Sequence, residues 1–209
     1  MAEKYQSHRQ LYALMNRIPQ SQGNIMADWL GGVFSAIDEG RPIVYNQFTL
    51  FSELMVAMDI QLLCPELWSV ALLSTDKHAC CDSIDAAQEA GISPELCSAN
   101  KTMIGDIMLD KMPPPSMVIL PTFPCDNSKI GYQVVARLTG APIYYLDCPY
   151  WMDEGEAMEY WVNQYKGLIS FLQEHTGKKL DYDRLKEVAE ESNRYIDYWL
   201  EGTELLRAK

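Results

Sequence analysis

Between residues 42 and 146 the chain alternates four short apolar runs with segments of helical periodicity, and this alternation constrains the fold more than any other feature. The segments between the runs carry apolar residues three and four positions apart, as helices do. Strands that alternate with helices form a mostly parallel sheet with helices on both faces. The sequence therefore predicts an α/β fold with an open sheet of about four strands. The predicted strands are 42–45, 60–64, 117–121 and 142–146.

Helices are also predicted on both sides of this region. Apolar spacing predicts one N-terminal helix before Pro19 and a second over about 24–38. After residue 156 only helical periodicity remains, with long helices over 157–175 and from 181 to about 206. We interpret the aromatic residues of these last helices as packing contacts. The predicted organisation is N-terminal helices over 1–40, an α/β domain over 41–155 and a C-terminal helical segment over 156–209.

Composition and charge exclude several functional classes. The 209 residues carry 29 acidic and 17 basic side chains, for a net charge of −12, whereas a general nucleic-acid binder needs a basic surface. No apolar stretch reaches the length of a membrane span, and the N-terminus lacks the apolar core of a signal peptide. We therefore expect a cytoplasmic protein without nucleic-acid or membrane partners, whose six cysteines are reduced.

Three cysteines lie at the ends of predicted strands: Cys64 closes the second strand, Cys125 follows the third and Cys148 follows the fourth. The carboxyl ends of parallel strands share one edge of the sheet, where open α/β sheets bind their ligands. Cys97 lies in the connection between the second and third strands. The sequence thus allows four thiols to converge on one crevice, and thiolates there suit zinc or an iron–sulfur cluster. Because no Cys-x-x-Cys knuckle is present, the cluster is the better interpretation.

Other catalytic motifs receive little support. The chain has neither a phosphate-binding glycine loop nor a Gly-x-Ser-x-Gly motif. His8, His78 and His175 lie in polar surroundings and are interpreted as surface residues. The adjacent Cys80 and Cys81 offer redox chemistry, although burial at a helix start explains them more simply.

Two features near the predicted crevice favour ligand binding. The helix that follows Cys125 would direct its first backbone N–H groups toward the crevice, where they favour negative charge. Ser98, next to Cys97, is either a substrate contact or only a helix N-cap.

Several of these segments resemble the 2-hydroxyacyl-CoA dehydratase / benzoyl-CoA reductase subunit family. The resemblance rests on Leu96-Cys97-Ser98, on the strand leading to Cys125-Asp126 and on the segment 138–143, and it extends from about residue 40 through the helical tail. Family members carry an oxygen-sensitive [4Fe-4S] cluster held by three cysteines, with one iron open. The resemblance implies that Cys97 and Cys125 are two of these ligands.

The resemblance also bears on the organisation of the chain. The third cysteine of the family lies in a second α/β domain downstream, so the chain resembles a fragment or one half of a split protein. Cys148 and Cys64 do not match family ligands, and we keep them as weaker candidates for a substitute ligand.

The implied function is that of an iron–sulfur subunit of a radical 2-hydroxyacyl-CoA dehydratase, which is a lyase, or of a benzoyl-CoA reductase-type enzyme. A low-potential, one-electron reduced [4Fe-4S] cluster would act on a CoA thioester in an anaerobic setting. A homologous partner subunit in a dimer and an ATP-dependent activator iron–sulfur protein are implied as partners. Lys101 and Lys129 are candidate contacts for CoA phosphates.

Two alternatives stay open. A double-cubane-cluster reductase of small molecules would need further thiols besides Cys97 and Cys125. A cluster-free α/β scaffold subunit would use its cysteines only to fill the core.

Overall fold

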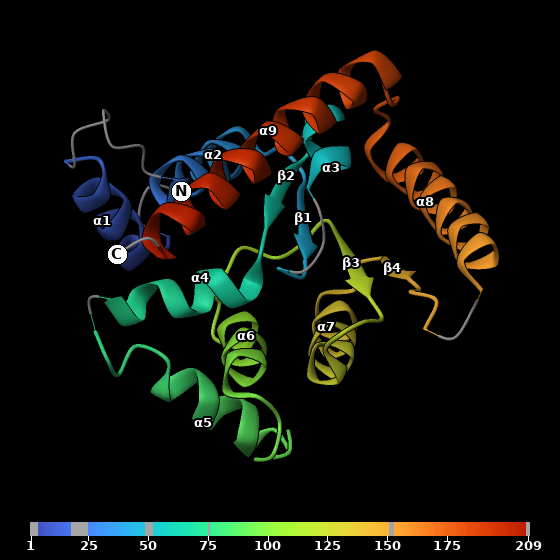
Figure 1. Cartoon of the computed structure of the whole chain (residues 1–209). Coiled ribbons are helices and arrows are strands. Elements are labelled where there is room, and N and C mark those ends of the chain that lie inside the picture. Colours follow the sequence, from blue (N-terminus) through green and yellow to red (C-terminus); the bar gives the residue numbers. More distant parts are fainter. Residues whose placement is uncertain (1–3, 18–24, 49–51, 75, 151–152, 208–209) are drawn as a thin grey trace.

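The computed structural model has the predicted α/β architecture, with one sheet between layers of helices (Figure 1). It describes residues 4–17, 25–48, 52–74, 76–150 and 153–207. Within these ranges the elements are α1 (Gln6–Met15), α2 (Ile25–Glu39), β1 (Ile43–Asn46), α3 (Glu53–Ala57), β2 (Gln61–Leu63), α4 (Pro65–Ala71), a 3-10 turn (Leu72–Ser74), α5 (Cys81–Glu89), α6 (Ser98–Met108), β3 (Met117–Pro121), α7 (Asp126–Thr139), β4 (Ile143–Leu146), α8 (Glu154–Thr176) and α9 (Tyr182–Arg207).

The four strands form a single parallel sheet in the order β2-β1-β3-β4. Val44 of β1 pairs with Leu62 on one side and with Met117 on the other. The chain leaves β1 toward β2 and then crosses over to β3, so the strand order reverses between β1 and β3. Ligands of open α/β sheets bind at the carboxyl edge near such a reversal. All four strands lie within one residue of their predicted bounds.

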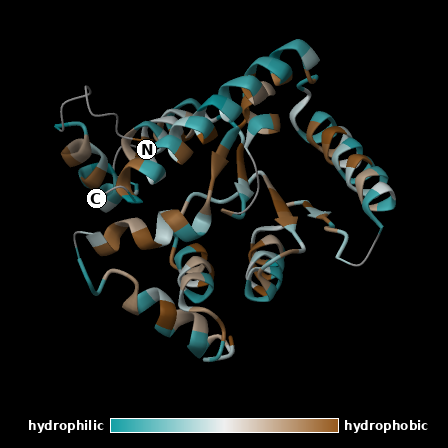
Figure 2. Ribbon diagram, viewed as in Figure 1, coloured by the Kyte–Doolittle hydropathy of each residue, from teal (hydrophilic) through white to brown (hydrophobic). Residues whose placement is uncertain are grey.

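Side chains of the strands alternate between two hydrophobic cores. Tyr45 of β1 points into the larger core together with Trp68 of α4 and Tyr132 of α7. Val44, the preceding residue, points into the smaller core, where Leu168 of α8 covers it. The central strand β3 is buried at every position and brown in Figure 2, whereas β1 ends at Asn46 and β2 begins at Gln61.

Two glycines allow α5, α6 and α7 to pack unusually closely. A Cβ atom on Gly105 of α6 would lie 1.9 Å from the carbonyl oxygen of Ser83 in α5. A Cβ atom on Gly131 of α7 would lie 2.3 Å from Oδ1 of Asn100 in α6. Only glycine permits the approach at Gly105, because the neighbouring atom belongs to the backbone of α5. At Gly131 the missing side chain leaves room for Asn100, at the start of α6, against α7.

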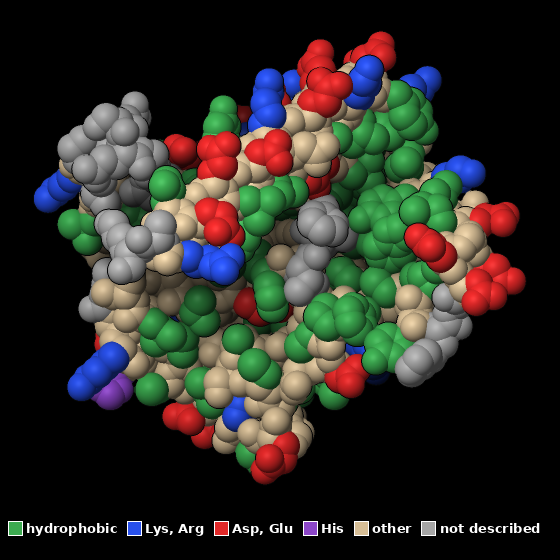
Figure 3. All heavy atoms as spheres, in the orientation of Figure 1, with side chains coloured by type: hydrophobic (Ala, Val, Ile, Leu, Met, Phe, Trp, Pro, Cys, Tyr) green, Lys and Arg blue, Asp and Glu red, His purple; other side chains and the backbone are tan. Residues whose placement is uncertain are grey.

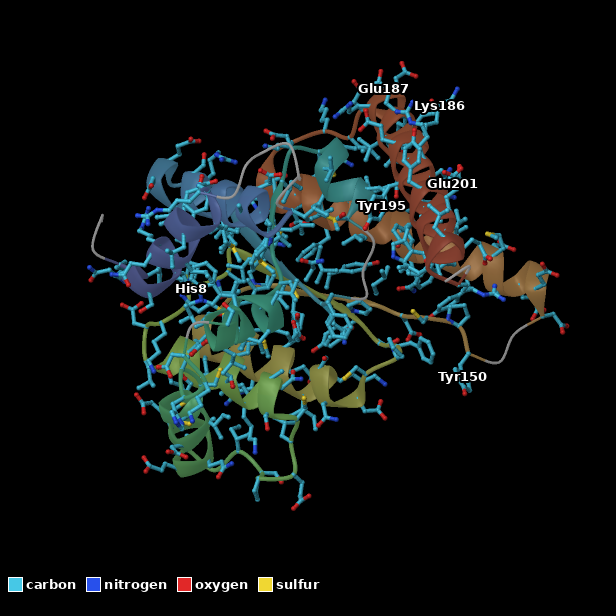
Figure 4. All side chains as sticks on the ribbon, turned by 60° about the vertical axis from the view of Figure 1, so that its left-hand side comes forward. His8, Tyr150, Lys186, Glu187, Tyr195 and Glu201 are labelled. Atoms are coloured by element: carbon cyan, nitrogen blue, oxygen red, sulfur yellow. The ribbon has the colours of Figure 1, made fainter. Side chains whose placement is uncertain are left out.

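The prediction that His8 lies at the surface is wrong. Its side chain is only 4% exposed, and its ring stacks on Trp68 with 3.9 Å between centroids. Its Nε2–H donates a hydrogen bond of 2.9 Å to the carbonyl oxygen of Trp68. Figure 4 shows His8 on α1, beside α4. A partner that is 60 positions away in the chain leaves no mark on the local sequence pattern. His78 and His175 are exposed, as predicted.

Helix α9 departs from its prediction in a different way. It packs on α3, where the Ser192 hydroxyl donates to the Glu53 carboxylate at 2.5 Å, but Tyr195 and Trp199 are each 60% exposed. Trp199, which the sequence pattern indicated as a packing contact, is thus largely uncovered by the described residues. Apolar spacing marks a face that favours burial, whether or not the same chain covers it. Figure 3 shows hydrophobic side chains among the charged ones along this helix, and Figure 4 shows Tyr195 on it.

None of the helices in the described ranges combines the length and the apolar character that crossing a membrane requires.

Candidate functional site

Helices α6 and α7 begin side by side, and each begins at one of the two predicted ligand thiols (Figure 1). Cys97 is the N-cap residue of α6 and Cys125 is the N-cap residue of α7. The backbone N–H of Cys97 donates a 3.0 Å hydrogen bond to Oδ1 of Asn127, in the first turn of α7. Cys97 is exposed and Cys125 is half-buried. The N-cap residues of α6 and α7 therefore lie close to one another, beside the carboxyl edge of the sheet.

The electrostatic setting of this thiol pair favours negative charge. Both helices direct the free N–H groups of their first turns toward it, and helix starts attract anions. The first turn of α6 contains no acidic residue, while Asp126 in the first turn of α7 is paired with Lys129 at 2.8 Å. Lys101, one turn into α6, is only 6% exposed.

Ser98 is the first helical residue of α6 and is exposed. Because Cys97 occupies the N-cap position, the interpretation of Ser98 as an N-cap is wrong. Its carbonyl oxygen accepts a hydrogen bond from the Thr102 hydroxyl at 2.8 Å. Substrate contact by Ser98 stays a prediction.

Cys148 lies in the loop after β4, next to the loop that carries Cys125. Its backbone N–H donates to the Thr122 hydroxyl oxygen at 3.1 Å. The Thr122 hydroxyl in turn donates to Asp147, which also accepts a 2.6 Å bond from Tyr160 of α8. Burial raises the pKa of the Cys148 thiol, which disfavours the thiolate that a metal would need.

An exposed aromatic pair borders the same loops. The rings of Phe123 and Tyr150 lie 5.8 Å apart, and both side chains are more than 45% exposed. Figure 4 shows Tyr150 at the outer end of the β4 loop. The pair gives the Cys125 side of the site an apolar rim.

Cys64 is enclosed in a buried polar cluster beneath the carboxyl edge. Its Sγ lies 3.4 Å from the Glu66 carboxylate, which also accepts a 2.6 Å bond from the Tyr132 hydroxyl. Burial and the neighbouring Glu66 raise the pKa of the Cys64 thiol strongly. Burial likewise raises the pKa of Glu66. A neutral, buried thiol is a poor metal ligand.

The buried carboxylate of Glu66 was not predicted as part of a site. The dipeptide Pro65-Glu66 indicates only a helix start, and its contact with Tyr132 joins positions 66 apart. No local signal in the sequence marks such a pair.

The four predicted thiols do not converge as a group. Within the part of the chain that the structure describes, no three His, Cys, Asp or Glu side chains are placed to hold a metal ion. The reason is geometric, because Cys64 turns into the core while Cys97 and Cys125 face outward at the helix starts. The adjacent Cys80 and Cys81 occupy the start of α5, where Cys80 is buried and Cys81 is exposed.

Comparison with known proteins gives the following similarities. The family model described as "2-hydroxyglutaryl-CoA dehydratase, D-component" matches residues 50–209. The "(R)-2-hydroxyisocaproyl-CoA dehydratase alpha subunit" of Clostridioides difficile is 25% identical over 175 residues, which is 79% of this chain and 42% of that protein. The chain thus spans less than half the length of this curated relative. Both the α6 and α7 helix starts fall inside the matched regions of the family model.

Proposed function

The chain belongs to the 2-hydroxyglutaryl-CoA dehydratase D-component family, and from this membership we propose that it is an iron–sulfur component of a radical 2-hydroxyacyl-CoA dehydratase. Its substrate class would be the CoA thioesters of 2-hydroxy acids, and its reaction the removal of water. The observation that carries the proposal is the pairing of Cys97 and Cys125 at two adjoining helix starts.

The residues at this place fit two ligand positions of a [4Fe-4S] cluster. The 3.0 Å bond from Cys97 to Asn127 fixes the loop before α6 against the first turn of α7. Both thiols keep access to the surface, and two helix starts favour the negative charge of thiolate ligands. The two cysteines would offer these ligands from separate loops.

When bound, such a cluster supplies one low-potential electron and an open iron to the thioester. The residues of this chain would hold and shield that chemistry. Cys97 and Cys125 would ligate, Asn127 would orient the Cys97 loop, and the backbone N–H groups of both helix starts would stabilise negative charge. The apolar rim at Phe123 would limit the access of water from one side.

Two thiols are fewer than the three ligands that family resemblance implies. We expect the third ligand from a second α/β unit, toward which the helices of residues 156–209 would lead. A homologous partner subunit and an ATP-dependent activator iron–sulfur protein complete the proposal. The raised pKa values of Cys64 and Cys148 argue against these two residues as substitutes.

Anaerobic reconstitution with iron and sulfide tests the proposal. Visible absorption and electron paramagnetic resonance should report a cluster in the wild-type protein. Cys97→Ser and Cys125→Ser should each weaken or abolish the signal. Cys81→Ser is the matched control, because Cys81 is also an exposed thiol at a helix start, and this variant should retain the signal.

Two results would overturn the assignment. A cluster that survives loss of both Cys97 and Cys125 but not of Cys64 or Cys148 would place the ligands elsewhere. A wild-type protein that binds no iron, alone and with a homologous partner subunit present, would leave the scaffold function as the better interpretation.

A further inference from the structure

A cavity of about 610 Å³ lies between α1, the end of α4 and the start of α5, on the side of the molecule where Figure 1 shows these three helices. Helix α6 contributes Asp106 to its lining, near the opposite end of that helix from Cys97. At about 1.5 Å per residue, roughly 13 Å of helix separates these two residues. The cavity is therefore distinct from the candidate cluster site, and its volume suits a small organic ligand.

The charge of the cavity lining is mostly negative. The charged residues of the lining are Asp76, Asp82, Asp106, Asp110 and Lys111. Lys4 holds Asp110 at 2.7 Å, and Nζ of Lys111 lies 3.7 Å from the Asp82 carboxylate. Asp76 and Asp106 have no ion-pair partner among the described residues. Two carboxylates of the lining thus lack a counter-ion within the described ranges.

Asp106 is the most deeply buried of these carboxylates, at 5% exposure. Its two oxygens accept hydrogen bonds of 2.8 Å from the Ser69 hydroxyl and 2.6 Å from the Ser83 hydroxyl. Burial raises the pKa of Asp106, and the charge of Lys111 opposes this only in part. A cation in the cavity would offset the cost of the buried charge, because an opposite charge nearby favours the ionised carboxylate.

A hydrogen-bond acceptor without a partner indicates a ligand independently of these charges. The buried ring of His8 lines the cavity and donates through Nε2–H to the Trp68 carbonyl oxygen. Burial lowers the pKa of His8 to about 4, so the ring is neutral at pH 7 and its Nδ1 carries a free lone pair. No described residue hydrogen-bonds Nδ1, and Nδ1 is not one of the unpartnered atoms sealed inside the described structure. This acceptor therefore opens on the cavity.

The lining selects a particular chemical class of ligand. Its acceptors lie beside an apolar wall to which Leu11, Leu14 and Leu72 contribute. A bare metal ion fits poorly, because the cavity is far larger than one ion and no three His, Cys, Asp or Glu side chains of the described residues are placed to hold a metal. An organic ammonium ion fits both parts. Its N–H groups donate charge-assisted hydrogen bonds to the acceptors, and its hydrocarbon part contacts the leucines.

We propose that this cavity is a binding site for a small organic ammonium ion, held by the carboxylates of Asp76 and Asp106 and by Nδ1 of His8. The site is additional to the proposed function and does not depend on it, since no iron–sulfur cluster takes part in the binding. Because its lining comes from α1, α5 and α6 among other elements, the bound ion would bridge these helices.

The test is a titration of metal-free protein, followed by NMR of ¹⁵N-labelled histidine side chains. The probe is phenethylamine, and its neutral and anionic analogues are 2-phenylethanol and phenylacetate. Phenethylamine should shift the Nδ1 resonance of His8 saturably, whereas the exposed His175, which is outside the lining, should not respond. 2-Phenylethanol should bind at least about tenfold more weakly because it lacks the charge, and phenylacetate should not bind.

A pair of matched variants tests the assigned carboxylates. Asp76→Asn removes one charge but keeps an oxygen for the backbone N–H of His78, which Asp76 accepts at 2.9 Å. This variant should bind phenethylamine about tenfold more weakly than the wild type. Asp85→Asn is the control, because Asp85 is an exposed carboxylate of α5 outside the lining. It should bind phenethylamine as the wild type does.

Three results would overturn the proposal. The first is the lack of a saturable His8 shift with phenethylamine. The second is equal binding of 2-phenylethanol, because the cavity would then recognise only the apolar part of the ligand. The third is equal binding by Asp76→Asn and the wild type. Because the measurements need neither iron nor sulfide, failure here leaves the proposed cluster untouched, and a protein without a cluster leaves this test intact.

Discussion

The buried His8 gives the sharpest prediction for the pH dependence of stability. Burial lowers the pKa of His8 from 6.5 to about 4, because the charged ring would be separated from water. The hydrogen bond from Nε2–H to the Trp68 carbonyl oxygen opposes this lowering only in part. The unfolded chain therefore binds a proton more readily than the folded one. The stabilising contribution of neutral His8 is complete above pH 6.5 and is lost as the pH falls toward 4.

The size of this effect follows from the shift. Each pKa unit corresponds to about 1.4 kcal/mol, so the whole contribution is about 3 kcal/mol. The perturbation is His8→Gln, whose side-chain amide can still donate to the Trp68 carbonyl oxygen but does not titrate. This variant loses the ring stacking of His8 on Trp68 at every pH. That loss lowers its free energy of unfolding by the same amount at each pH and does not change how this free energy depends on pH.

The assay is urea denaturation followed by tryptophan fluorescence at several pH values. The difference in free energy of unfolding between wild type and His8→Gln should change by about 3 kcal/mol between pH 7 and pH 4, to the disadvantage of the wild type at low pH. Taking the difference removes the titration of the carboxyl groups, which both proteins share. His175→Gln, at an exposed histidine, should run parallel to the wild type. If the free energy of unfolding of His8→Gln changes with pH as that of the wild type does, the reasoning is refuted.

Three other substitutions test buried contacts. Tyr132→Phe deletes the 2.6 Å bond to Glu66 and should lower the free energy of unfolding by about 1–3 kcal/mol in urea denaturation; an unchanged midpoint would contradict the role of this bond. Glu66→Gln removes a carboxyl group with a raised pKa, whose stabilising contribution is present below pH 4.5 and is lost as the pH rises through the folded-state value; the variant should therefore lose less stability than the wild type as the pH rises above 4.5. Leu168→Ala opens the smaller core and should cost about 2–5 kcal/mol, whereas the same change at the exposed Leu205 should cost little.

The strands and most helices were predictable because their signals are local. The run Met117-Val-Ile-Leu-Pro121 is apolar at every position, and β3 has these bounds. Gly140 follows α7 with a positive φ of 71°, as a glycine after a helix often does. Spacing, caps and turn residues within a short window therefore settle where most elements begin and end.

The contacts that shape the site were less predictable because they join distant positions. The strand ends predicted the placement of Cys125, but nothing near Cys97 indicated that its N–H would meet Asn127, 30 residues later. The inward turn of Cys64 depends on Glu66 and Tyr132 meeting across the core. Such outcomes depend on packing between elements, which a local pattern does not record.

The exposed face of α9 illustrates a third case. The sequence pattern placed Ile196 and Trp199 along one helix with apolar spacing, which favours burial, yet both side chains are exposed. Periodicity describes the helix alone and carries no information on which molecule or segment covers it.

The hydrogen bonds around Asp147 give the Cys125 loop a mechanical link to a distant helix. Asp147 accepts from Thr122 on one side and from Tyr160 of α8 on the other, so a single carboxylate connects the long helix to the β3–α7 turn. The turn before α7 and the first half of α8 thus share one acceptor, so a substitution at Asp147 would release both of them at once.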